Sequence, residues 1–285
     1  MSSLPADARN ADQIAHWNGP TGRRWVDHQE HQDALLRPIL DAALARADVQ
    51  PGERVVDIGC GCGGSTLELG RRVGRAGRVL GIDVSAPMLA RAAERSTPEL
   101  PVAFVRADAT VYPLPGDFDL LFSRFGVMFF AEPARAFANL RAGLRPGGRL
   151  LFVCFRTPRE NPWMIVPLEA AYAHVPKPPE TAPDDPGPFA FAREERMRGI
   201  LGAAGFARID LAPLDLSLDL AGGRGLDAAV AATLAIGPVS RALEGHPPQT
   251  RNAVAASIRR AIAPHQRGET VALASGTWLV SAVSP

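Results

Sequence analysis

Three aspartates and a run of glycines are spaced along this 285-residue chain so that together they could bind a small polar molecule. Residues 54–66 read RVVDIGCGCGGST, a short apolar run that contains Asp57 and ends in glycines. A strand that stops in glycines and restarts as a helix brings backbone N–H groups close to a bound molecule. Asp83 and Asp108 each follow a later apolar run. Carboxylates in such places accept hydrogen bonds from hydroxyl and amino groups.

The glycine run fits two classes of nucleotide site. Gly59, Gly61 and Gly64 satisfy the G-x-G-x-x-G fingerprint, and Asp83 lies about 20 residues further on, where a dinucleotide site has its ribose-binding acid. A NAD(P)-dependent oxidoreductase is therefore one hypothesis. Asp57 favours another, because its carboxylate would repel a pyrophosphate but suits a ligand with an ammonium and a sulfonium group. S-adenosylmethionine (SAM) is such a ligand.

The ends of the second and third apolar runs favour a nucleoside. Asp83, with Val84 beside it, can accept hydrogen bonds from both hydroxyls of a ribose, because an ionised aspartate has two acceptor oxygens. Met88 would then lie against a flat base. Asp108 can accept from an exocyclic amine while the Ala109 N–H donates to a ring nitrogen, a pair that would recognise an adenine edge. The alternatives are a helix-terminal charge for Asp83 and a turn role for Asp108.

The fourth apolar run ends in FSRFGVMFF, beyond the expected cofactor position. Ser123 is assigned to the cofactor site, and Arg124 to an anionic group of the substrate or to a cofactor carboxylate. Phe125 and Phe129 are assigned to the wall of a substrate pocket, with core packing as the alternative. This end of the sheet should therefore face the second reactant.

The elements that position these residues alternate between strand and helix. Strands are expected at 55–58, 78–82, 103–106, 120–123 and 149–155, and helices at 65–72, 87–95 and 133–144. Short apolar strands that alternate with helices specify a parallel sheet covered on both faces. In such sheets ligands bind outside the carboxyl ends of the strands, where the aspartates lie.

The flanking segments follow other patterns. Residues 13–47 are expected to be helical, with an interruption at 18–20, and 146–148 to form a turn. The proline-rich tract 176–188 should form no regular element. After residue 156 the expected elements are helices at 163–173, 193–204, 226–242 and 249–262, and strands at 208–218 and 277–283.

Four motifs in this order and spacing, VVDIGCGCG, GIDVSAPML, RADA and FSRFGVMFF, are similar to those of the class I SAM-dependent methyltransferases. The resemblance is greatest to the small-molecule group that includes the ubiquinone and menaquinone biosynthesis methyltransferases, and it is strong over 55–155. It implies an α/β, Rossmann-like, doubly wound sheet of seven strands, mostly parallel, with the antiparallel last strand at 277–283.

The resemblance also implies which part of SAM each residue of the site would bind. Gly59, Cys60 and Gly61 would hold the methionyl part of SAM, Asp83 the ribose, and Asp108 with Ala109 the adenine. Because the segment before the first strand often folds over the cofactor in this family, Trp17 and Trp25 become candidates for a cover over SAM.

The chain is accordingly divided into an N-terminal helical cap, 1–49, and a SAM-binding methyltransferase domain, 50–285. Within the domain, 156–192 and 219–268 are expected to be insertions that form a lid and shape the substrate pocket.

The predicted activity is transfer of a methyl group from SAM to a small-molecule acceptor by in-line displacement, with the accepting atom (O, N or C) left open. Holding the two reactants in line can lower the activation barrier by roughly 7–11 kcal/mol. Because the departing sulfur needs no protonation, a general base is required only if the acceptor must lose a proton. His28 is the candidate base, with His16 and His31 also in the N-terminal segment. A non-catalytic SAM-binding protein is a further alternative.

Composition and motif content indicate which classes of partner the sequence disfavours. Thirty-one basic and 30 acidic residues give a formal net charge of +1, which disfavours nucleic acid as a partner, and the fourth strand lacks the Asn/Asp-Pro-Pro-aromatic tetrapeptide of nucleobase and protein-amide methyltransferases. No apolar run is long enough to span a membrane and no leader is visible, so a cytoplasmic protein is expected. No metal is predicted, because Cys60 and Cys62 are too closely spaced for a zinc site and no histidine lies near them.

Overall fold

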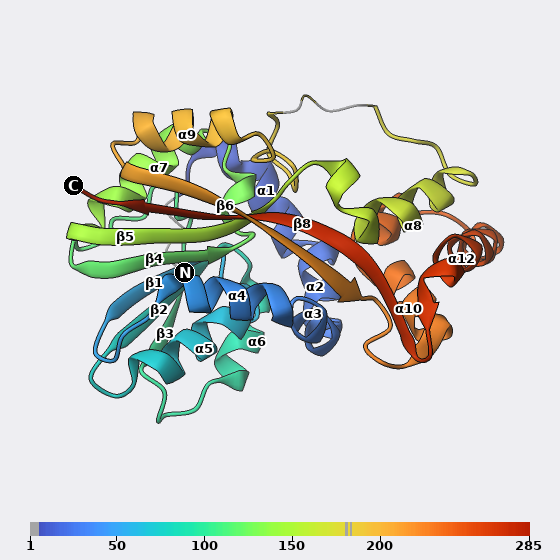
Figure 1. Ribbon diagram of the computed structural model, residues 1–285, viewed down its shortest axis with the longest axis horizontal. Helices are drawn as coiled ribbons and strands as arrows, with labels where there is room; N and C mark the ends of the chain where they lie inside the picture. The colour runs from blue at the N-terminus through green and yellow to red at the C-terminus, as the bar shows by residue number, and fades with distance from the viewer. Residues whose placement is uncertain (1–5, 180–181, 183) are drawn as a thin grey trace.

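The computed structural model describes residues 6–179, 182 and 184–285 (Figure 1). Its centre is a twisted sheet in the order β3-β2-β1-β4-β5-β8-β6. The strands are β1 (Arg54–Ile58), β2 (Arg78–Asp83), β3 (Val102–Arg106), β4 (Phe118–Arg124), β5 (Leu144–Phe155), β6 (Ala207–Asp219) and β8 (Thr270–Val283). β1 to β5 pair in parallel, whereas β8 runs antiparallel to both β5 and β6. The expected α/β, Rossmann-like sheet of seven strands with an antiparallel last strand is confirmed.

Helices cover both faces of the sheet because neighbouring residues of each strand point to opposite sides. Val55 packs in the hydrophobic core beneath α4 (Arg37–Ala47) and α5 (Gly64–Val73). Val56 packs in the core beneath α7 (Pro133–Ala142) and α9 (Glu194–Ala203). Successive apolar residues of one strand are thus buried in opposite helical layers, which is the pattern that predicts a sheet covered on both faces.

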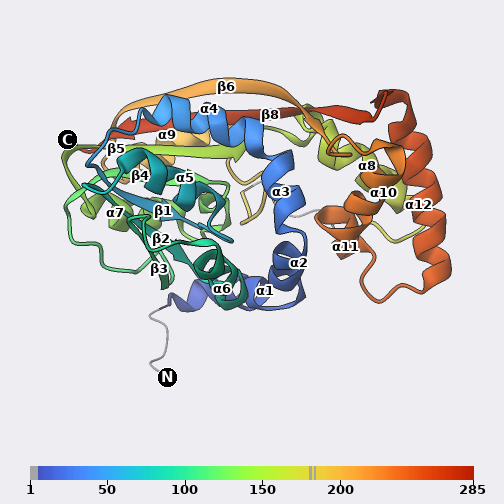
Figure 2. The same ribbon diagram turned by 90° about the horizontal axis from the view of Figure 1, so that it is seen from below.

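A second group of helices lies at the end of the molecule where β6 and β8 extend beyond the rest of the sheet (Figure 2). It consists of α8 (Pro162–Tyr172), α10 (Gly225–Ala235), α11 (Pro238–Ala242) and α12 (Pro248–Ile262). α8 packs against α12 and α11, although the chain reaches them through different connections. These helices come from the two stretches that the sequence marks as insertions, and below we call them the helical insert.

The N-terminal segment, expected as helix over 13–47, is divided into α1 (Ala11–Asn18), α2 (Pro20–Asp27), α3 (Gln29–Leu35) and α4. A 3₁₀ turn, η1 (Ala8–Asn10), precedes α1, and α6 (Ala86–Arg95) packs against α2. In Figure 2, α2 and α3 lie between the sheet and the helical insert. That residues 1–49 form a separate cap on the methyltransferase domain remains a proposal.

Several expected boundaries are wrong, each for a local reason. The expected helix 226–242 breaks at Gly237, which adopts a φ of +88° and precedes Pro238. The expected turn at 146–148 lies inside β5, where the register against β4 shifts and leaves the extra residues as a bulge. β8 begins seven residues earlier than the expected 277 because its first half pairs with β6 and with the two-residue strand β7 (Gln266–Arg267).

Within the described ranges no helix is long and apolar enough to cross a bilayer.

Candidate functional site

A cavity of about 300 Å³ lies where the carboxyl ends of β1, β2 and β4 meet the N-terminal helices and the helical insert. Its wall includes most of the residues that the sequence places at the site: Trp17, Trp25, Gly59, Cys60, Gly61, Asp83, Val84, Met88, Asp108, Ala109, Arg124, Phe125 and Phe129. These side chains come together because parallel strands all end at one edge of a sheet. Three of the predicted residues, Asp57, Ser123 and His28, are not on the wall.

The glycine loop after β1 needs glycine at two positions. Gly59 has a φ of +67°, and a Cβ added there would lie 2.6 Å from the Gly126 Cα. Gly61 has a φ of +55°, and its Cβ would lie 2.8 Å from the Met88 Cε. Both φ values describe a left-handed backbone, which glycine adopts without strain, and at Gly59 the neighbour is backbone that leaves no room for a side chain. The loop therefore brings bare backbone to the cavity wall.

Asp83, the last residue of β2, holds this loop in place. One carboxylate oxygen accepts a hydrogen bond from the Gly61 N–H at 2.8 Å, and the other accepts from the Ser85 N–H at 2.8 Å. Burial raises the pKa of the carboxyl, and the backbone hydrogen bonds oppose that rise. Each oxygen retains acceptor capacity toward the cavity, as expected of a group that binds a vicinal diol.

Asp108, in the loop after β3, is 1% exposed and already has several donors. Oδ1 accepts from the Thr110 N–H, the Thr110 hydroxyl and Asn10 Nδ2, and Oδ2 accepts from the Asp7 N–H. The Ala109 N–H makes no hydrogen bond to any residue that the structure describes. An acceptor oxygen and a free N–H are thus adjacent, as the adenine assignment requires.

Asp57 lies beneath the glycine loop and is not among the residues of the cavity wall. It is 0% exposed, and Oδ2 accepts hydrogen bonds from Ser65 Oγ at 2.6 Å and Thr66 Oγ1 at 2.7 Å. Burial raises its pKa to about 6. Oδ1 has no partner among the described residues, so one face of the carboxylate is left for a donor.

Ser123 and His28 are also absent from the cavity wall. Ser123 is 1% exposed; its hydroxyl donates to the Ile58 carbonyl at 2.7 Å and accepts from the Gly126 N–H at 3.2 Å. It joins the ends of β1 and β4 from behind the wall. His28 stands between α2 and α3 and does not line the cavity, whereas two other histidines do. We therefore withdraw His28 as candidate base.

Arg124 approaches the glycine loop rather than the helical insert. Its side chain is 12% exposed and its Nη2 lies 3.8 Å from Asp33 Oδ1, while its Nη1 is buried without a partner among the described residues. Burial lowers its pKa, and the charges of Asp33 and Asp57 oppose that effect. The unpartnered guanidinium nitrogen makes Arg124 a ready donor for a carboxylate.

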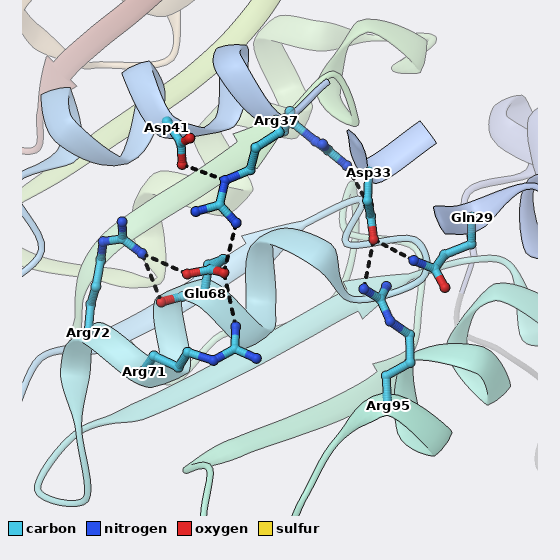
Figure 3. Close-up of polar contacts among 9 residues, drawn as sticks. Gln29, Asp33, Arg37, Asp41, Glu68, Arg71, Arg72 and Arg95 are labelled. Carbon is cyan, nitrogen blue, oxygen red and sulfur yellow. Dashed lines mark hydrogen bonds and ion pairs between the residues drawn. The ribbon is translucent and has the colours of Figure 1, made fainter. Parts of the chain in front are cut away.

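Asp33 of α3 is held over the start of α5 (Figure 3). Its Oδ2 accepts from Arg95 Nη2 at 2.7 Å and from Gln29 Nε2 at 2.6 Å. Arg95 also donates to the Cys62 carbonyl in the glycine loop. A Cβ added to Gly64 would lie 2.7 Å from Asp33 Oδ1, so the carboxylate contacts the first turn of α5 directly.

A second polar cluster fixes the N-terminal segment on the sheet layer. Glu68 of α5 accepts from Arg37 Nη1 at 3.1 Å, from Arg71 Nη1 at 3.0 Å and from Arg72 Nη1 at 3.2 Å (Figure 3). Arg37 also pairs with Asp41 one turn further along α4. Because these side chains are partly exposed, we assign them a positioning role rather than a large stabilising one.

The other half of the cavity is aromatic. Phe125 follows β4 with a φ of +66°, a conformation that is unusual for a bulky side chain and that is found mainly at functional sites. Its ring stacks on Phe155 at 4.1 Å between centroids, and Phe155 contacts Trp163 of α8 at 5.9 Å. Trp17 contacts Phe129 edge to face at 5.4 Å. These residues form an apolar chamber beside the polar one.

Two histidines line the cavity, His16 of α1 and His31 of α3. Burial, followed by the charge of Arg241, lowers the pKa of His16. Burial and the charge of Arg224 lower the pKa of His31. Both imidazoles are therefore neutral at physiological pH, the form that accepts a proton.

The comparisons with known proteins agree with this geometry. Residues 55–148 match the model of a methyltransferase domain. The ubiquinone/menaquinone biosynthesis C-methyltransferase UbiE of Serratia proteamaculans is 30% identical over 178 residues, which cover 56% of this chain and 69% of that protein. The chain belongs to the class I SAM-dependent methyltransferases.

A second relative of this methyltransferase is the trans-aconitate 2-methyltransferase of Deinococcus radiodurans, 40% identical over 128 residues. That match covers 44% of this chain and 47% of the relative, so the chain spans about half the length of that protein. The match to UbiE extends further. The family model itself matches 55–148, which contain β2 to β4, nearly all of β1 and the start of β5.

Solved structures share the fold. Phosphoethanolamine N-methyltransferase 2 of Haemonchus contortus, in complex with phosphomonomethylethanolamine and S-adenosylhomocysteine, superposes with a TM-score of 0.54 at 19% identity, over 87% of this chain and 52% of that one. The YcgJ protein of Bacillus subtilis gives a TM-score of 0.55 at 17% identity, over 86% of this chain and 97% of that one. At these identities the likeness concerns the fold.

SAM is the cofactor of this methyltransferase, and the charges around the glycine loop fit it. Asp33 pairs with Arg95 and Arg124, and Arg124 also interacts with the charge of Asp57. Asp83 has backbone donors only, so these three carboxylates exceed the two guanidinium groups by one negative charge. SAM carries a net positive charge, whereas a dinucleotide carries negative phosphates. The charge balance thus favours SAM over NAD(P).

Sequence reasoning missed several residues on the cavity wall. Asn10, Gln29 and Asp33 come from the N-terminal segment, and Ile236 and Val239 from the helical insert. The signal in the sequence was a polar stripe at helical spacing, Gln29, Gln32 and Asp33, and the structure shows that Gln29 in this stripe is only 5% exposed. A polar stripe does not reveal which element it faces, so the local sequence could not place these residues.

No cluster of three or more potential metal ligands occurs in the described part of the chain.

Proposed function

We propose that this methyltransferase acts on a small molecule with a flat, largely apolar body. The observation that supports this most is the aromatic chamber built by Phe125, Phe155 and Trp163 beside the glycine loop. The helical insert supplies Ile236 and Val239 to the same space. A chamber of this composition takes a compact apolar ligand better than a polymer. The near-neutral charge of the chain further disfavours nucleic acid.

The proposed cofactor site uses the polar half of the cavity. Gly59, Cys60 and Gly61 would hold the methionyl part, with the buried Asp57 acting on the ammonium group from below the loop. Arg124, which the sequence left between substrate and cofactor, would take the carboxylate, because its Nη1 has no partner among the described residues and the side chain lines the cavity.

The nucleoside part of SAM would be bound at the ends of β2 and β3. Asp83 would bind the ribose, flanked by Val84 and Met88, and Asp108 with Ala109 would bind the adenine. Above them, Trp17 and Trp25 would cover the cofactor; their rings contact each other at 6.2 Å. All of these side chains line the one cavity.

SAM supplies an electrophilic methyl group whose transfer needs no protonation of the departing sulfur. The contribution of this chain is therefore to hold the acceptor and to exclude water. The Phe125 and Phe155 rings would hold a flat acceptor, with Phe129 closing the side that faces Trp17. Where the acceptor must lose a proton, a neutral His16 or His31 on the wall would accept it.

The base assignment predicts a pH profile. Replacing one of His16 or His31 by glutamine is expected to lower kcat by about 10²–10⁴-fold with a small change in KM. Because the pKa of each histidine is lowered, the neutral form persists on acidification, and the native rate should fall only below about pH 6.5. Steady-state kinetics between pH 5 and 9 measure both. His28→Gln is the control and should leave the rate unchanged; full activity of both cavity variants would eliminate a histidine base.

The proposed acceptor class is tested with SAM that carries a trideuterated methyl group. The protein is incubated with this SAM and with a panel of aromatic, carboxylic and lipophilic metabolites, and mass spectrometry detects the transferred label. Label on a small aromatic or lipophilic compound is the expected result. Label confined to added RNA or protein would contradict the proposal, and tight SAM binding without transfer to any compound would support a non-catalytic role.

A further inference from the structure

Asn10 lies at the adenine end of the cavity and is almost fully buried, with 7% of its surface exposed. Its Nδ2 donates a hydrogen bond to Asp108 Oδ1 at 3.2 Å. This bond fixes the orientation of the side-chain amide. The carbonyl oxygen, Oδ1, then has no hydrogen-bond partner in the part of the chain that the structure describes. A buried amide oxygen without a donor is costly unless a ligand or water supplies one.

The surroundings of Asn10 define the kind of donor that would fit. Asp108 Oδ1 already accepts from Thr110 and Asn10, whereas Oδ2 accepts only from the Asp7 N–H and retains acceptor capacity. Two acceptors, Asp108 Oδ2 and Asn10 Oδ1, therefore belong to neighbouring side chains. A primary amine on an aromatic ring has two N–H groups and satisfies both. The free N–H of Ala109 can donate to a ring nitrogen next to that amine.

The segment that carries Asn10 is fixed at both ends of α1. At the far end, Asn18 donates from Nδ2 to the Val84 carbonyl at 3.0 Å and accepts from the Ala86 N–H at 3.0 Å. The Ser85 hydroxyl donates to the Trp17 carbonyl at 2.7 Å. α1 thus connects the loop after β2 to the loop after β3, and this connection holds Asn10 against Asp108.

We propose that Asn10 is a specificity-determining residue that recognises the 6-amino group of adenine jointly with Asp108. The inference rests on the proposed placement of SAM in the cavity and adds a contact from the N-terminal segment to it. A base that carries a 6-oxo group would turn a carbonyl oxygen toward the oxygens of both side chains. Because acceptor faces acceptor in that case, Asn10 should contribute to rejecting such a base.

The test compares two ligands by isothermal titration calorimetry: S-adenosylhomocysteine (SAH) and S-inosylhomocysteine, its 6-oxo analogue. The native protein is expected to bind SAH more tightly. Asn10→Ala should weaken SAH binding roughly 10- to 30-fold but S-inosylhomocysteine binding less than about 3-fold, so that the preference falls about tenfold. Gln13→Ala, which removes another amide from the cavity wall, is the matched control and should leave the preference unchanged.

The outcomes separate this inference from the proposed function. If Asn10→Ala weakens both ligands equally, Asn10 only positions the segment and the proposal is overturned; the same holds if neither affinity changes. If the native protein fails to bind SAH at all, the proposed cofactor site itself is wrong. Thermal unfolding of each variant checks that the fold is intact, and Asn10→Ser replaces the alanine variant if that variant unfolds.

Discussion

Asp83→Ala is expected to raise the Kd for SAM and SAH by about 10²–10⁴-fold, because the substitution removes both a ligand contact and a contact that holds the glycine loop. The carboxylate would no longer accept from the ribose hydroxyls, and the Gly61 N–H would lose the partner that holds the glycine loop. Hydrogen bonds to a charged group contribute about 1.5–3 kcal/mol each, which gives the expected range. Isothermal titration calorimetry with SAM, SAH and NADH measures the change.

Asp119→Ala is the matched control for this experiment. Asp119 accepts from the Arg54 N–H at 2.8 Å and from the Arg145 side chain, so it resembles Asp83 in bonding, but it lies near the start of β4, away from the cavity. Its replacement should lower thermal stability without changing the Kd for SAH. An unchanged Kd in Asp83→Ala would remove the ribose assignment, and binding of NADH in place of SAM and SAH by the native protein would remove the cofactor site.

Asp57→Asn is expected to have two opposite effects: a more stable protein and weaker binding of SAH. Burial raises the pKa of Asp57 to about 6 from an ordinary value near 4. A carboxyl with a raised folded-state pKa destabilises the fold once it ionises, and this penalty grows between about pH 4 and 6 and is fully present at pH 7. The neutral amide avoids it, so the free energy of unfolding at pH 7 should rise by about 1–3 kcal/mol.

Binding should change in the other direction. The unpartnered Oδ1 of Asp57 is the acceptor proposed for the cofactor ammonium, so Asp57→Asn should weaken SAH binding at least about tenfold. In the native protein the same ionisation should make SAH affinity fall as the pH drops below about 6, and the variant should lose this dependence. Urea denaturation and calorimetry from pH 5 to 8 measure both effects. Lower stability together with unchanged affinity would show that Asp57 only braces the loop.

The parallel part of the fold could be predicted because its signals are local. Each of β1 to β5 contains a short apolar run, and alternation with helices leaves few topologies. β6 was also predicted to within one residue at each end, but the start of β8 was not, since its first half pairs with β6 beyond the main sheet. The break at Gly237 was visible as a Gly-Pro pair, but the apolar pattern continued through it.

The candidate site shows the same division. Asp83, Asp108 and Arg124 could be placed on the cavity because Asp83 and Arg124 are the last residues of parallel strands and Asp108 follows one. Asp57 could not, because it belongs to the strand itself and its side chain points beneath the loop rather than out of it. Asn10 and its contact to Asp108 span 98 positions in sequence, and nothing local to either residue indicates that pairing. Long-range contacts of the cap therefore had to come from the structure.

The most direct test of the central claim is a crystal structure of the protein in complex with SAH. We predict that the ribose hydroxyls lie within hydrogen-bonding distance of the Asp83 carboxylate and that the amino acid carboxylate lies on Arg124. The adenine should lie against Met88, with its ring nitrogen on the Ala109 N–H. SAH bound outside this cavity, or bound in it with the adenine in the aromatic chamber of Phe125 and Phe155, would contradict the account.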